Sequence, residues 1–78
     1  MRQVYELSTE DMVKLIEEAL DNQVDCSEAK VGGGAGSTAV TGIKDKKTGN
    51  VLSFPFDYNM NEDDFKMSVK NHFLLNNG

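Results

Sequence analysis

The chain has little of several residue types that carry recognisable chemistry. Its 78 residues include one cysteine, one histidine, one proline and no tryptophan. A single cysteine cannot form an intrachain disulfide, and a lone thiol is typical of a reducing compartment, which predicts a cytoplasmic protein. Cys26 and His72 are too few for a four-ligand zinc site, so we expect no metal and no cofactor.

Long apolar runs are also missing. A membrane-spanning helix needs about 18 or more consecutive apolar residues, and no stretch of this sequence approaches that length. One positive charge, Arg2, stands near the start without an apolar stretch behind it, so we expect no secretory signal. The length predicts a single small domain over residues 1–78. Because small domains often gain stability from self-association, a homodimer is compatible with it.

Basic residues are outnumbered. Eight lysines and arginines stand against thirteen acids, for a net charge of −5. This balance disfavours direct binding to nucleic acid or to an anionic membrane, since both need a basic face. The charges are also unevenly distributed: residues 6–28 hold eight acids and one base, whereas residues 29–56 hold four lysines and one aspartate. We therefore expect an acidic helical layer beside a mildly basic hairpin.

Two segments have the pattern of amphipathic helices. The first begins after Ser8, a good N-cap, and is expected to run to about Asn22. The second begins after Asn61, another good N-cap, and is expected to fray at residues 76–78. Apolar residues recur at the helical period in both segments. These are Met12, Ile16, Ala19 and Leu20 in the first helix, and Phe65, Val69 and Phe73 in the second.

Three segments between the helices are expected to form strands: residues 24–31, 38–44 and 51–58. The last alternates most clearly and places Pro55 within it, which predicts an edge strand. The fold class is therefore α+β. We expect a three-stranded antiparallel β-meander with two helices packed on one face, in the order α-β-β-β-α. A short extra N-terminal strand over residues 2–7 is compatible with the pattern.

Residues 32–36 contain four glycines, which predicts a flexible loop. The sequence after them lacks the lysine of a P-loop and the helix of a dinucleotide-binding turn. Glycine amides can nevertheless surround an anion. The alternative functional hypothesis is therefore a binder of a small anionic ligand or nucleotide, built as a homodimer if two loops are needed. The candidate residues are Gly33, Gly34, Gly36, Ser37 and Lys44.

Nothing in the sequence predicts catalysis. No pair of carboxylates stands out as an acid–base set, and no residue near Cys26 or His72 supports a nucleophile–base pair. We therefore expect no catalytic residues and a protein that is not an enzyme.

The first helix breaks a local rule that suggests a function. Glu17, Glu18 and Asp21 stand toward its C-terminal end, where the helix dipole disfavours an anion by about 0.3–1 kcal/mol. Acids kept at such positions predict a contact surface for a basic partner. The main hypothesis is a small acidic interaction protein that inhibits or competes at a basic, nucleic-acid-binding surface of another protein. The candidate partner-binding residues are Glu10, Glu17, Glu18, Asp21 and Asp25.

In size and acidity the chain resembles the small accessory proteins of bacteriophages and mobile elements, including anti-CRISPR and DNA-mimic inhibitors. The resemblance covers bulk character and rests on no motif. No residue role is carried over from those proteins.

Overall fold

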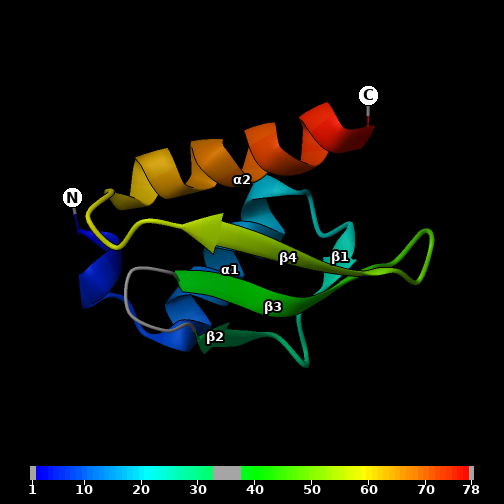
Figure 1. The fold of residues 1–78 in the computed structure, drawn as a ribbon, viewed down its shortest axis with the longest axis horizontal. Helices are drawn as coiled ribbons and strands as arrows, with labels where there is room; N and C mark the ends of the chain where they lie inside the picture. Colours follow the sequence, from blue (N-terminus) through cyan, green and yellow to red (C-terminus); the bar gives the residue numbers. More distant parts are fainter. Residues whose placement is uncertain (1, 33–37, 78) are drawn as a thin grey trace.

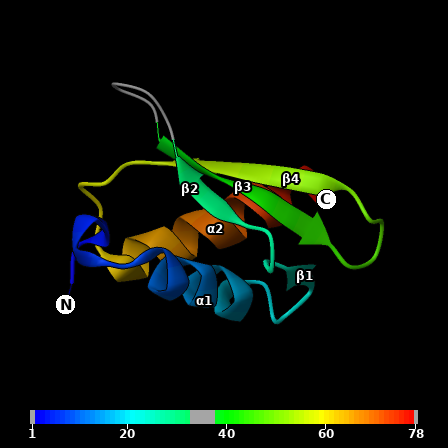
Figure 2. The ribbon, with the colours of Figure 1, turned by 90° about the horizontal axis from the view of Figure 1, so that it is seen from below.

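The structure is a computed structural model that describes residues 2–32 and 38–77, with side chains described as far as Phe73. The elements, in chain order, are η1 (Val4–Glu6), α1 (Thr9–Ala19), β1 (Val24–Asp25), β2 (Lys30–Gly32), β3 (Thr38–Asp45), β4 (Val51–Phe56) and α2 (Glu62–Asn77). The strands form one antiparallel sheet, and both helices lie on the same face of it (Figures 1 and 2). The α+β class with two helices on one face of an antiparallel sheet is confirmed.

β3 is the central strand of the sheet. Lys44 shows the arrangement, because it opposes Asp25 of β1 on one side and Val51 of β4 on the other. β2 pairs with the same edge of β3 as β1, further along the strand. The sheet is therefore the expected meander, except that the single strand expected over 24–31 is divided into β1 and β2 by a turn at residues 26–29.

A β-bulge in β3 accounts for this division. The pairing with β4 shifts between Val40 and Ile43, which brings both side chains into the core. Gly42 lies within the bulge with a φ of +78°, and a Cβ built on it would stand 2.6 Å from the carbonyl oxygen of Glu28. Only glycine fits this combination of left-handed backbone and close approach. The turn that separates β1 from β2 thus packs directly against the bulge at Gly42.

Local capping starts both helices at the residues that the sequence indicates. The Ser8 Oγ accepts a hydrogen bond from the Asp11 amide (3.1 Å), and the Asn61 Oδ1 accepts one from the Asp64 amide (2.9 Å). These side chains satisfy amides that the first helical turn leaves without partners. Among the residues of α2 whose side chains are described, the buried ones are Phe65, Val69 and Phe73, as expected. The backbone of α2 is helical to Asn77, which includes two of the residues where the sequence predicts fraying.

Two expectations about element ends differ from the structure. α1 ends at Ala19, because Asp21 and Asn22 have φ angles of 53° and 58° and so leave the helical region. At the N-terminus, the short strand over residues 2–7 is not formed. Those residues contain the 3-10 turn η1, and Gln3 makes only an isolated bridge to Asn61.

The core lies between the sheet and the helices. Phe65 of α2 is fully buried and meets Phe54 and Phe56 of β4 edge-on, at ring-centroid distances of 5.5 and 5.3 Å. Edge-to-face packing of this kind is favourable for aromatic rings.

The inward-facing side chains of β4 end with Phe56. Tyr58 lies beyond the strand, with 41% of its surface exposed. Within the described residues β4 pairs with β3 alone, which confirms Pro55 on an edge strand.

Candidate functional site

One side of α1 packs into the core and the opposite side carries charge. Met12 and Ile16 are buried, whereas Glu10, Lys14 and Glu18 are exposed. The two glutamates are eight residues apart, which corresponds to about 12 Å along a helix. Glu10 and Glu18 therefore share one exposed face, whereas Glu17, the third predicted acid of this helix, is half-buried.

The C-terminal end of α1 is its most electronegative part. Glu17 and Glu18 occupy the last turn, Asp21 follows it in a left-handed conformation, and the last turn has no basic residue. The carbonyl ends of the helix carry partial negative charge of their own. Both ion pairs found among the described residues belong to Arg2, which contacts Asp11 and Glu62. Glu17, Glu18 and Asp21 are therefore left without a cation within ion-pair distance in that part of the chain.

Asp25 has a different electrostatic setting from the acids of α1. The pKa of its carboxyl is held below its ordinary value first by hydrogen bonds from Ser27, whose amide lies 2.9 Å from Oδ1. Lys44, which opposes it on β3, and Lys46 lower it further. The charge of Asp25 is thus partly balanced by Ser27 and by the two lysines of β3 and the β3–β4 turn.

Cys26 is a core residue with 5% of its surface exposed. Burial raises the pKa of its thiol to about 11, and the nearby charges of Glu17 and Asp25 act in the same direction. The thiol is therefore neutral near pH 7, which makes it a poor nucleophile. His72 is half-buried and packs against Phe73, with ring centroids 5.0 Å apart.

A cavity of about 530 Å³ adjoins the acidic end of α1. It lies between the end of this helix, the turn that joins β3 to β4, and α2. The turn is held in place by a hydrogen bond from the Lys46 amide to the carbonyl oxygen of Gln23 (3.1 Å). The apolar part of the lining consists of Ala19, Leu20, Val24, Leu52 and Phe73. The charged part consists of Glu18, Asp21, Asp45, Lys47 and Lys70.

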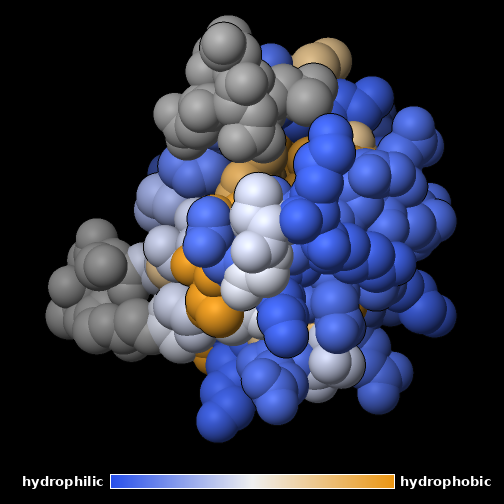
Figure 3. All heavy atoms as spheres, turned by 90° about the vertical axis from the view of Figure 1, so that its right-hand side faces the viewer, coloured by the Kyte–Doolittle hydropathy of each residue, from blue (hydrophilic) through white to orange (hydrophobic). Residues whose placement is uncertain are grey.

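Figure 3 looks onto the end of the molecule at which β1, the β3–β4 turn and the C-terminus lie. Hydrophilic residues cover most of the half of the view away from the sheet. On the sheet side the surface is paler, and hydrophobic atoms emerge between hydrophilic ones. This end of the protein therefore joins a hydrophilic helical side to a less polar sheet side.

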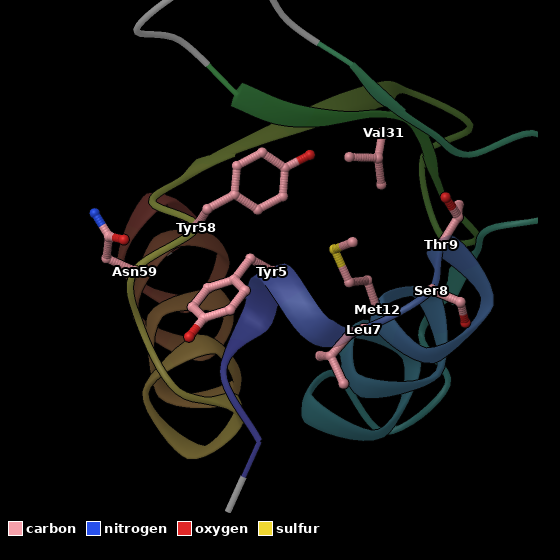
Figure 4. Close-up of a pocket in the computed structure, with 8 residues that line it drawn as sticks. All are labelled: Tyr5, Leu7, Ser8, Thr9, Met12, Val31, Tyr58 and Asn59. Carbon is pink, nitrogen blue, oxygen red and sulfur yellow. The ribbon is translucent and has the colours of Figure 1, made fainter.

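A second cavity, also of about 530 Å³, lies at the opposite end of α1 (Figure 4). The described residues of its lining are all uncharged and include two tyrosines, Tyr5 and Tyr58, that lie on separate segments (Figure 4). Buried Met12 and half-buried Val31 supply apolar surface to one side of the tyrosines (Figure 4). No local sequence pattern predicts either cavity, because each is lined by segments that are far apart in the chain.

The glycine-rich segment gives little support to the alternative site. Gly33, Gly34, Gly36 and Ser37 lie outside the described residues. Lys44 is six residues beyond Thr38 on β3, which corresponds to roughly 20 Å along a strand. The structure therefore does not bring Lys44 to the strand ends that border the segment.

Residues 2–32 and 38–77 contain neither a cluster of metal ligands nor a helix that could span a membrane. No three histidine, cysteine, aspartate or glutamate residues gather there in a way that could hold a metal ion. Neither helix in this part of the chain has the length and apolar character needed to cross a membrane.

In comparisons with protein-family models, with curated proteins and with solved structures, the chain matches none.

Proposed function

We propose that this protein is a non-enzymatic interaction protein that docks the exposed acidic side of α1 on a basic surface of a partner protein. The observation that carries the proposal is the C-terminal end of α1. Glu17, Glu18 and Asp21 gather there, and no cation of the described residues lies within ion-pair distance of them. A partner's lysines and arginines would supply the missing positive charge.

Electrostatics favours such an arrangement for recognition. Charges that are unsatisfied in the free protein accelerate encounter with an oppositely charged surface and select against acidic ones. Extended basic surfaces on proteins are commonly grooves that bind nucleic acid. We therefore propose that docking blocks such a groove, so that the protein acts in the cytoplasm as an inhibitor or competitor. Its small size and acidity are those of accessory inhibitors from bacteriophages and mobile elements.

The proposal is tested by capture from a lysate of the source organism or its host, with bound proteins identified by mass spectrometry. The Debye length falls from about 10 Å at 0.1 M salt to about 3 Å at 1 M. We expect a basic, nucleic-acid-handling protein to be retained at the lower salt concentration and lost at the higher one. Nucleic acid added to the purified complex should compete with the protein for the same partner.

Charge reversal identifies the surface that docks. The double variant Glu10→Lys/Glu18→Lys changes two exposed side chains on α1 and should abolish capture. Asp63→Lys/Asp64→Lys makes the same change of charge in the exposed first turn of α2 and should retain the partner. A partner that resists 1 M salt, or one that the α1 variant still captures, would contradict acidic docking.

A further inference from the structure

We propose that the cavity at the end of α1 receives one lysine or arginine side chain of the partner protein. This inference rests on the proposed function and assigns a specific contact to it. The occupant follows from two properties of the cavity: an apolar floor and a rim with one negative charge in excess.

The floor suits the methylene stem of a long cationic side chain. Ala19, Leu20, Val24 and Phe73 line it, and all four belong to the buried core. Lysine and arginine commonly lay their stems along apolar surface while the charged head remains at its edge. A compact cation, such as a metal ion or ammonium, would leave this apolar surface uncovered.

The rim suits a single positive head group. The described lining includes three acids, Glu18, Asp21 and Asp45, and two lysines, Lys47 and Lys70, so these residues carry one net negative charge. One incoming cation neutralises it. Two cations would create an excess of positive charge, which argues against a polycationic ligand inside the cavity.

The lysines of the rim leave the acids of α1 accessible to a partner. Neither Lys47 nor Lys70 forms an ion pair with another described residue. The Asp45 carboxylate is engaged in its own turn, where its Oδ1 accepts a hydrogen bond from the Lys47 amide (2.9 Å). Glu18 and Asp21 are therefore the acids available to the incoming head group.

The ends of both helices reinforce this preference for a cation. α1 finishes at the cavity with Ala19 and Leu20, and α2 passes it at Phe73, near its own C-terminal end. Neither helix has a basic residue in its last turn. Because helix C-termini carry partial negative charge, their potentials add to those of Glu18 and Asp21.

The test is an NMR titration of the ¹⁵N-labelled full chain with Nα-acetyl-lysine amide and Nα-acetyl-arginine amide. Amide shifts should concentrate in the last turn of α1, β1 and the β3–β4 turn. Methylammonium has the charge without the stem, and Nα-acetyl-norleucine amide has the stem without the charge. Both should bind at least about fivefold more weakly than the lysine derivative, since each lacks one of the two interactions.

Variants separate the rim from the general acidity of α1. Glu18→Gln/Asp21→Asn removes both rim acids, and asparagine tolerates the left-handed backbone at position 21. This variant should weaken binding of the lysine derivative about tenfold. Glu10→Gln removes a charge from the same helix face at its other end and should change the affinity by less than about twofold. The spectra themselves show whether each variant is folded.

Absence of binding, or shifts spread evenly along α1 and equal for methylammonium, would overturn this assignment of the cavity. Capture from lysate then distinguishes it from the proposed function. If Glu10→Lys/Glu18→Lys abolishes capture while Glu18→Gln/Asp21→Asn retains it, acidic docking stands without the cavity. If neither variant affects capture, both proposals fail.

Discussion

The carbonyl oxygen of Glu28 lies 2.6 Å from the position that a Cβ on Gly42 would occupy. The bulge of β3 and the turn between β1 and β2 therefore fit together only because residue 42 has no side chain. Contact at this point lets one edge of β3 pair with two short strands in succession.

Gly42→Ala should destabilise the protein strongly. The left-handed backbone costs about 1–2 kcal/mol for alanine, and displacing the Glu28 carbonyl adds to it, for a total of roughly 3 kcal/mol or more. Gly49→Ala is the matched control, because Gly49 has the same φ of +78° with no atom within 4 Å of a built Cβ. It should lose only the backbone contribution. Urea denaturation of both variants measures the difference, and equal losses would show that the contact with Glu28 is unimportant.

Phe65→Leu should lower the free energy of unfolding by about 1–3 kcal/mol. The substitution removes the edge-on contacts with Phe54 and Phe56 and leaves a space in the core. Met67 is on the same helix with 61% of its surface exposed, so Met67→Ala should stay within about 0.5 kcal/mol of the wild type. Denaturant titrations that found the two variants equally stable would contradict this account of the core.

Arg2→Ala should reduce stability by less than about 1 kcal/mol at low salt. Arg2 bridges the starts of both helices through Asp11 (3.4 Å) and Glu62 (3.5 Å), in partly exposed pairs that solvent screens. The difference from wild type should vanish in 1 M salt, where charges are screened beyond about 3 Å. Thermal unfolding at both salt concentrations measures it. A loss that persists at high salt would indicate packing by the arginine stem.

The Cys26 thiol should make stability fall as the pH rises from 9 to 11. Its pKa is raised from an ordinary value of 9.0 to about 11, chiefly by burial. In this range the unfolded chain releases a proton that the native state retains, so unfolding becomes more favourable. Cys26→Ala removes this contribution while other groups continue to titrate. The wild type should therefore lose more stability than the variant between pH 8 and pH 11 in urea titrations, and parallel losses would contradict the raised pKa.

Features that depend on neighbouring residues could be predicted from the sequence. Both helix starts follow from short capping patterns at Ser8 and Asn61. The alternation after Val51 indicates a strand, and Pro55 within it indicates an edge position. The acidic side of α1 could likewise be predicted, because its glutamates recur at the helical period. These predictions need no knowledge of what packs against each segment.

Features that depend on distant residues could not be predicted. The break between β1 and β2 depends on Gly42, which is fourteen positions after Glu28 in the chain. The cavity at the end of α1 combines Leu20, Leu52 and Lys70 from three elements or their ends. The early end of α1 depends on the left-handed backbone of Asp21, which its residue type permits without requiring.

Every strand pairing among the described residues includes β3. β1 or β2 can therefore separate from the sheet by giving up two or three pairs of residues, whereas β3 can separate only when all the pairings are lost. Amide hydrogens of β3 should consequently exchange with solvent most slowly, on the timescale of global unfolding. Those of β1 should exchange through local opening, so the acidic end of the molecule can adjust to a partner while the rest of the sheet remains intact.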